Sequence, residues 1–191
     1  MGKRTNDPEG MRRRVLDVAA AAFQHAGYHA TGMHDLMRQA GITGGALYHH
    51  FPTKKALALA VIAERVGPQV QETWIDPVMA APSAAAGIRS VFADIVAGLE
   101  ARGSVSGCPL NNLALELSLA DPDFRAGIQA VFARWRTALG AKLSDDGATD
   151  PDGLATLVVS AYSGAMAMAK ADQTSAALIA CARQLDAMLA H

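Results

Sequence analysis

Residues 40–51, Ala-Gly-Ile-Thr-Gly-Gly-Ala-Leu-Tyr-His-His-Phe, decide the fold of this chain, because they have the pattern of the turn and second helix of a helix-turn-helix. Gly41 can adopt the left-handed conformation that ends one helix, and Thr43 can cap the next helix with its hydroxyl. Leu47 and Phe51 are four residues apart, so they share the helix face that packs into a core. The opposite face is predicted to be a recognition surface for the major groove of DNA.

The leading end of this helix carries the residues that would meet DNA. Gly44 and Gly45 weaken a helix, but they leave its backbone N–H groups open to a phosphate. Thr43 can donate to a phosphate as well as cap the helix, and capping alone is the alternative. Tyr48 can rest its ring on a sugar or a thymine methyl, and packing over a small helical head is the alternative.

Roughly residues 11–62 resemble the DNA-binding domain of the TetR/AcrR family of transcriptional regulators. The motifs that carry the resemblance are Ala22-Phe23, Gly27-Tyr28, Ala30-Thr31-Gly32-Met33, residues 40–51 and Pro52-Thr53-Lys54-Lys55-Ala56-Leu57. The resemblance implies DNA contacts from Thr31, His49 and Lys54. The sequence departs from the family at Gly44, where a basic or polar residue is frequent, and at Lys55, where an acidic residue is usual.

Charge is unevenly distributed along the chain. The net charge is −1, yet residues 1–65 hold nine Lys and Arg against five Asp and Glu, which leaves −5 for the rest. This asymmetry is typical of a DNA-binding head on an acidic body. A basic arm is predicted to follow the DNA backbone or enter the minor groove, with a merely solvated basic face as the alternative. It comprises Lys3, Arg4, Arg12, Arg13 and Arg14.

Lys54 and Lys55 stand in the first turn of the next predicted helix. A cation is unfavourable there because the helix dipole places partial positive charge at the same end. The pair therefore predicts a compensating anion nearby, and a DNA phosphate is the candidate.

The chain is predicted to be all-α, with about nine helices and no strand alternation. Residues 1–52 form the expected three-helix DNA-binding head, and residues 53–191 form a ligand-binding and dimerisation body, with the fourth helix as the link. That helix is expected to reach about Trp74, with Pro77 and Pro82 at the junction that follows. The other expected helices lie at about 9–26, 31–40, 43–51, 83–103, 109 onward, 121–143, 150–169 and 175–189.

The body has an apolar interior with a few polar groups, and its segment 107–116 looks like a stretch of the LmrA/YxaF-like branch of the family. The resemblance implies an effector cavity, while ordinary core packing is the alternative for each residue. Glu116 is expected at the surface, or buried against Arg134, Arg136 or a polar ligand group. The candidate ligand contacts are Trp74, Phe92, Leu110, Asn111, Leu113, Glu116, Phe132, Trp135, Tyr162 and Met166.

The last two helices are predicted to form a four-helix bundle with a second copy. The first of them is apolar almost all round, and Gly164 and many alanines permit close approach. A monomer that buries these residues internally is the alternative. The candidate interface residues are Leu154, Val158, Ala161, Ala165, Met168, Ala182, Leu185 and Met188.

Other functional classes have little support in the sequence. It contains no nucleophile elbow, phosphate loop or His-Glu-x-x-His motif, so an enzyme is not expected. Cys108 and Cys181 have no metal or disulfide spacing, so neither a metal nor a cofactor is predicted. The longest uncharged stretch, Leu154–Ala169, has 16 residues and several polar side chains, too few and too polar for a membrane span. With no export signal, a cytoplasmic location is expected.

These observations predict a homodimeric transcriptional regulator that responds to a ligand. We expect a repressor that a small apolar or aromatic effector releases from a palindromic operator in double-stranded DNA. The alternative is a small-molecule-binding helical protein or an enzyme with a vestigial DNA-binding head, a reading that Gly44 favours.

Overall fold

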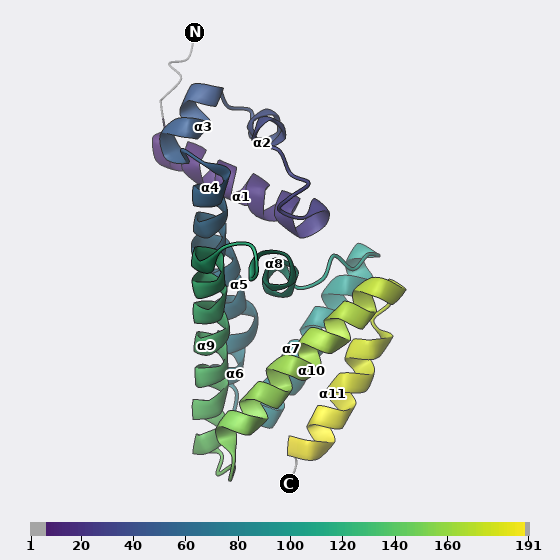
Figure 1. Ribbon diagram of the computed structural model, residues 1–191. Helices are drawn as coiled ribbons and strands as arrows, with labels where there is room; N and C mark the ends of the chain where they lie inside the picture. Colours follow the sequence, from purple (N-terminus) through teal and green to yellow (C-terminus); the bar gives the residue numbers. More distant parts are fainter. Residues whose placement is uncertain (1–6, 190–191) are drawn as a thin grey trace.

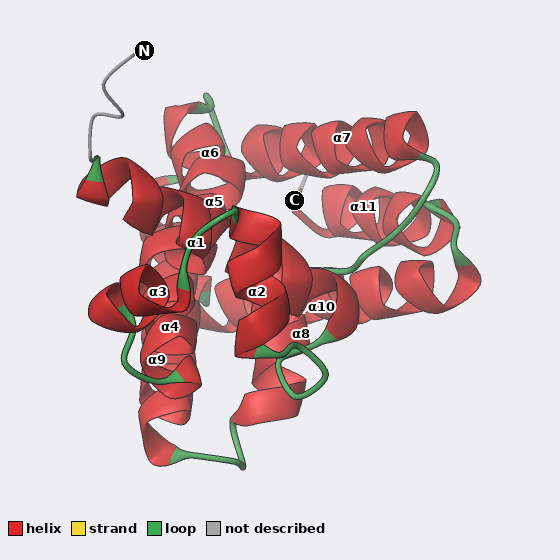
Figure 2. Cartoon of the chain, turned by 90° about the horizontal axis from the view of Figure 1, so that it is seen from above, coloured by secondary structure: helices red, strands yellow, loops and turns green. Residues whose placement is uncertain are grey.

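The computed structural model describes residues 7–189, and every regular element in that range is helical, which confirms the all-α prediction (Figure 1). Nine helical rods result when the run from Lys54 to Ala80 is counted as one. The head contains α1 (Pro8–Ala26), α2 (Met33–Ala40) and α3 (Gly44–His50). The head sits at one end of the molecule, on top of the longer helices of the body (Figures 1 and 2).

Local signals in the sequence set the turn between α2 and α3. Gly41 has a φ of 64° and ends α2, with its N–H donating to the carbonyls of Met37 and Arg38. Thr43 caps α3, because its Oγ1 accepts from the N–H of Ala46 at 3.3 Å. Leu47 is buried together with Leu16, Phe23, Leu36 and Phe51 in the core of the head.

A single long helix follows, made of α4 (Lys54–Val61), α5 (Gly67–Val70) and α6 (Asp76–Ala80), joined by π-helical turns at Ile62–Val66 and Gln71–Ile75. The expected end near Trp74 is therefore wrong. Pro68 and Pro77 lie inside the run, each just after a π-helical turn. A proline ring clashes with the preceding turn of an α-helix, and proline has no N–H to donate to the helical hydrogen bonds. A π-helical turn is wider, so it offers room for the ring at these two places.

The body continues with α7 (Ala84–Arg102), α8 (Pro109–Leu117), α9 (Pro122–Asp145), α10 (Pro151–Asp172) and α11 (Ala176–Leu189). Three of them start where the sequence predicts, near residues 83, 121 and 150: the side chains of Ser83, Asp121 and Asp150 accept N–H groups from the first turns of α7, α9 and α10. In Figure 1, α9 runs beside the long helix, α10 diverges from α9, and the short α8 lies between the head and the wedge that these two helices form.

α10 is a long and apolar helix. By length and composition alone it could cross a membrane, with a mean hydropathy of 1.3 over its best window, of which 39% is buried. In the fold it packs against both α9 and α11 and places Ala155, Val158 and Ala169 in the core. The fold thus accounts for the buried part of this apolar composition, while Leu157 and Met168 remain exposed.

Candidate DNA-binding surface and ligand cavity

The exposed face of α3 carries the residues that the sequence nominates for the major groove. Tyr48 is 50% exposed, and His49 is exposed beside it. A Cβ added to Gly45 would meet nothing within 4 Å, and one added to Gly44 would make an ordinary 3.5 Å contact with Sδ of Met37. Packing therefore requires neither glycine. Their bare backbone instead leaves the N-terminus of α3 open to close approach from outside.

The two threonines behave differently. Thr43 is exposed at the N-terminus of α3, where its Oγ1 serves as the cap. Thr31 is only 6% exposed, and its hydroxyl donates to the carbonyl of Gly27 at 2.7 Å. The expectation of a DNA contact from Thr31 is thereby corrected: the hydroxyl is used inside the turn between α1 and α2, and Gly32 occupies the cap position of α2.

Lys54 and Lys55 find partners within the chain. The Lys54 ammonium lies 4.3 Å from the ring centroid of Tyr28 and 3.5 Å from the carbonyl of His29, and partial burial lowers its pKa. Lys55 pairs with Asp121 at 2.6 Å and with Asp123 at 2.7 Å. The anion predicted for Lys55 is thus the acidic start of α9, and this pair ties the long helix to α9.

Arg12 and Arg13 of the predicted basic arm also have different surroundings. Arg12 forms a two-pronged ion pair with Glu64, both N–O distances being 2.5 Å, and its guanidinium lies 5.3 Å from the ring centroid of Phe51. Arg12 therefore joins the head to the long helix, which corrects its assignment to a free basic arm. Arg13 is exposed. Lys3 and Arg4 lie outside the described residues.

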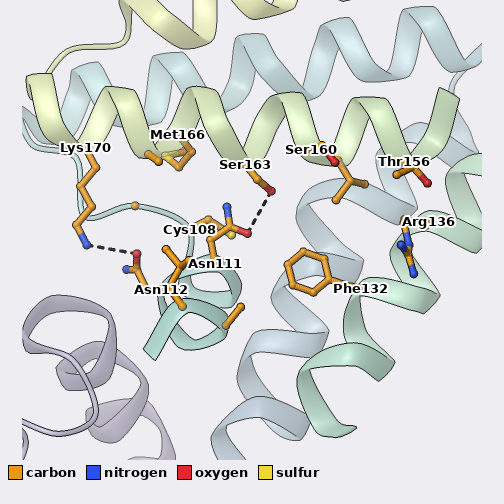
Figure 3. A pocket seen from close by; sticks show the side chains of 15 residues that line it. Cys108, Asn111, Asn112, Phe132, Arg136, Thr156, Ser160, Ser163, Met166 and Lys170 are labelled. Atoms are coloured by element: carbon orange, nitrogen blue, oxygen red, sulfur yellow. Dashed lines mark hydrogen bonds between the residues drawn. The ribbon is translucent and has the colours of Figure 1, made fainter. Parts of the chain in front are cut away.

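A cavity of about 620 Å³ opens between α8, α9 and α10 (Figure 3). Its volume falls in the range typical of small-molecule sites. Three of the nominated ligand contacts line it: Asn111, Phe132 and Met166. The remaining lining residues are Gly107, Cys108, Asn112, Ala114, Leu115, Arg136, Thr156, Val159, Ser160, Ser163, Ala167 and Lys170.

Most of the nominated aromatic residues form the core behind this cavity. Trp74 contacts the rings of Phe92, Trp135 and Tyr162 with centroid distances of 4.7–5.5 Å, and all four side chains are at most 5% exposed. These four residues are corrected from ligand contacts to core, because they pack on one another and the space beside Trp74, Trp135 and Tyr162 is only about 40 Å³. Leu110 and Leu113 are likewise buried outside the cavity wall.

Phe132 links the aromatic core to the cavity. Its ring stacks on that of Trp135, with 6.5 Å between the ring centroids and an interplanar angle of 10°. A ligand that touches Phe132 is therefore one ring away from the buried indole of Trp135, whose fluorescence can report ligand binding indirectly. Burial also raises the pKa values of Tyr162 and Cys108, so both side chains remain protonated at neutral pH.

Glu116 is corrected from a cavity residue to a link between head and body. Its Oε2 accepts the N–H of Tyr28 at 2.8 Å, and its Oε1 accepts the N–H of His29 at 2.7 Å. Gly27 precedes these amides with a φ of 88°, and a Cβ there would lie 3.1 Å from the Glu116 carboxylate. Glycine therefore serves both the backbone conformation and the close approach of the carboxylate.

A second set of contacts joins the same parts of the chain. Gln24 at the end of α1 donates to the carbonyl of Gly107 at 3.0 Å. Asn112 donates to the carbonyl of Gln24 at 3.4 Å, and its Oδ1 accepts from Lys170 at 3.3 Å. α8 and the loop before it therefore touch the head on one side while they line the cavity on the other.

The polar residues that α10 contributes to the cavity were missed by the sequence analysis. Thr156, Ser160 and Ser163 recur at spacings of four and three residues, and Lys170 continues the same face after one more heptad. This recurrence on an otherwise apolar helix is the signal that would have found them. Arg136 of α9 was considered only as a partner for Glu116.

The residues nominated for dimerisation divide between two faces of α10 and α11. Met168 and Met188 are 59% and 54% exposed, while Leu154, Ala161 and Ala182 are half-buried. Val158, Ala165 and Leu185 are at most 6% exposed, so they are corrected to the core of a single copy. α10 packs against α9 and α11 and buries Val158 and Ala165, while Leu157 and Met168 stay exposed.

Comparisons with known proteins agree with this architecture. Residues 15–61 match the model of the bacterial regulatory proteins of the tetR family, and residues 84–184 match that of the LmrA/YxaF-like transcriptional regulator C-terminal domain. The chain is 27% identical to the uncharacterized regulator YxaF of Bacillus subtilis over 93% of this chain and 94% of that protein. It is 26% identical to LmrA of the same organism, over 73% and 74% of the two chains.

A solved structure shows the same fold over nearly the whole length. The chain superimposes on a TetR transcriptional regulator from Chloroflexus aurantiacus with a TM-score of 0.86 and 26% identity, covering 98% of both chains. With the recognition helix, the long link helix and the two matched domains in place, the chain belongs to the TetR family of DNA-binding transcriptional regulators, in its LmrA/YxaF-like branch.

Proposed function

We propose that this protein is a homodimeric repressor that a small, largely apolar effector releases from a palindromic operator. In this proposal residues 1–52 read DNA, and residues 53–191 bind the effector and the second copy. The observation that carries the proposal is the double role of α8. It lines the 620 Å³ cavity with Asn111 and Asn112, and it holds the head through Glu116.

In this proposal, effector binding shifts an equilibrium between two conformations of the body. A ligand that fits the cavity better when α8 has moved favours the moved arrangement by its difference in affinity. Because Glu116 and Asn112 are fastened to the end of α1 and the turn after it, such a movement reaches the head. Two heads that are wrongly spaced no longer fit successive major grooves.

An enzymatic alternative is set aside, since the family and the fold are those of transcriptional regulators. Gly44, which favoured a vestigial head, fits a working one as well, because its Cβ position is free of clashes and its N–H group remains open.

The proposal is tested first on DNA. Selection from a random duplex library with the full chain should return a palindrome whose half-sites are one helical turn or a multiple of it apart. Asymmetric sites would contradict a symmetric dimer. In gel shifts with the selected duplex, a panel of aromatic compounds is then screened for release.

A cavity variant tests the effector site. Ser163→Trp places an indole in the middle of the cavity wall, so the concentration of a releasing compound needed for half-release should rise about tenfold or more. DNA affinity without the compound should stay unchanged. Ala130→Trp, at an exposed position of α9 outside the cavity, is the matched control. Equal sensitivity of the wild type and Ser163→Trp would move the effector site elsewhere.

Gly45→Ala should separate stability from DNA binding. Alanine is a better helix former, and the space around the added Cβ is open, so the free energy of unfolding should rise by about 0.5–1 kcal/mol. Operator affinity should nevertheless fall by about tenfold, because the methyl group holds the α3 backbone away from the groove.

The control for this prediction is Gly127→Ala in α9, where the added Cβ would make an ordinary 3.6 Å contact with Ile62. That variant should gain stability without any change in operator affinity. Urea denaturation and fluorescence anisotropy with labelled operator supply the two readouts. A Gly45→Ala variant that binds DNA as tightly as the wild type would show that α3 does not approach DNA through its N-terminus.

A further inference from the structure

The charged residues that line the α8–α9–α10 cavity all carry positive charge. Two cations line it, Arg136 of α9 and Lys170 of α10, while none of its described lining residues is acidic. The remaining walls are mostly apolar, with Phe132, Val159 and Met166 among them. An apolar cavity whose only formal charges are positive favours a ligand that is itself apolar and negatively charged.

Asn111 lines the same space and carries a buried donor. Nδ2 of Asn111 is buried without a hydrogen-bond partner among the described residues, while its Oδ1 accepts from Ser163 at 3.2 Å. In Figure 3, Asn111 lies between the two cationic ends of the cavity. Since an unpaired buried N–H is costly, the Asn111 amide would gain by turning Nδ2 toward a ligand oxygen in the cavity.

The two cations are not equivalent. Lys170 has structural roles of its own, since it lies in the last turn of α10, where a cation is favourable, and it donates to Asn112. Arg136 lies in the middle of α9 and forms no ion pair with the described residues. Figure 3 places Arg136 beside Thr156 and near Ser160, two further hydroxyl groups.

We propose that the cavity takes an aromatic carboxylate. The carboxylate binds the Arg136 guanidinium, the ring system packs on Phe132, Val159 and Met166, and an oxygen of the ligand, where present, accepts from Asn111. This inference deepens the proposed effector function and rests on it. Thr156 and Lys170 are about 20 Å apart along α10, so a ligand of ordinary size anchored at Arg136 does not reach Lys170.

The test uses two fluorescent probes with the same pyrene ring and chain length but different head groups, a carboxylate in 1-pyrenebutanoate and a neutral hydroxyl in 1-pyrenebutanol. Energy transfer from Trp135 and Trp74, the two tryptophans of the chain, to pyrene reports binding without DNA. We expect the carboxylate to bind about tenfold more tightly than the alcohol. Arg136→Gln should remove that advantage and leave the affinity for the alcohol within about twofold.

Lys170→Gln is the matched control, since it removes the other cation of the cavity. It should lower carboxylate affinity by less than about threefold. Arg136 is exposed, so its replacement leaves the core unchanged, and circular dichroism checks the fold of each variant. Equal affinity for the two probes, equal loss of both probes in Arg136→Gln, or loss of the advantage in Lys170→Gln would each overturn the proposal.

Release of labelled operator is measured in a separate titration, so the two proposals fail in different ways. If 1-pyrenebutanoate binds through Arg136 but does not release DNA, the ligand class stands and the effector role falls. If neutral aromatic compounds release DNA and the charged probe has no advantage, the effector role stands and the ligand class falls.

Discussion

Gly164→Arg is expected to separate the dimer into monomers and to lower operator affinity by on the order of 100-fold or more, because the two heads then bind their half-sites independently. Leu157, Gly164 and Met168 are spaced by seven and four residues, so they share one face of α10. Leu157 and Met168 are 40% and 59% exposed, and a Cβ at position 164 would meet nothing within 4 Å. A single copy therefore accommodates the arginine, and a partner packed on this face does not.

The measurement is sedimentation velocity combined with operator binding, and Gln129→Arg is the control because that residue is exposed and lies on α9, outside the two helices of the proposed interface. The control should remain dimeric and bind DNA normally. An intact Gly164→Arg dimer would rule out this face of α10 as the interface, whereas monomers that bind the operator with full affinity would refute the need for two heads.

Glu116→Ala is expected to loosen the head from the body. The substitution removes the acceptor of two backbone N–H groups, and charged hydrogen bonds at a half-exposed site suggest a loss of about 1–3 kcal/mol in the free energy of unfolding. Amide exchange at Tyr28 and His29 should accelerate, and an effector should act less strongly on DNA binding because α8 no longer holds the turn after α1.

Two control variants accompany the Glu116→Ala prediction. Glu116→Gln keeps one oxygen but turns an amide N–H toward a backbone N–H, so it should lose part of the stability. Glu72→Ala removes an exposed carboxylate from the long helix and should have little effect. Urea denaturation and hydrogen exchange by NMR supply the data. Unchanged exchange at Tyr28 and His29 would mean that the carboxylate merely neighbours these amides.

Local features of the fold could be predicted from the sequence because their causes lie within a few residues. Gly41 needs a left-handed conformation, and Thr43 has its hydroxyl three residues before the N–H that it caps. The starts of α7, α9 and α10 follow from Ser83, Asp121 and Asp150 in the same way. The end of the long helix could not be predicted from Pro77, since a π-helical turn accommodates the ring.

The roles of individual side chains depended on distant partners instead. Arg12 and Glu64 are 52 residues apart, and Glu116 meets backbone groups 87 and 88 residues earlier in the chain. No spacing rule connects such positions, so Arg12 was assigned to DNA and Glu116 to the ligand site. Trp74 and Tyr162 were assigned to the ligand site for a related reason: an aromatic residue on an inward face suits a cavity wall and a packed core equally well.

The sequence by itself thus determined the family, the all-α class, the recognition helix and most helix boundaries, since caps, turns and helical periodicity act over one or two turns of the chain. Only the tertiary structure decided which inward residues line the cavity and which fill the core. It likewise decided that Thr31 bonds within the turn between α1 and α2, and that Arg12 and Glu116 connect the head to the body. The reason is that a side chain's hydrogen bonds and burial depend on elements that folding alone brings together.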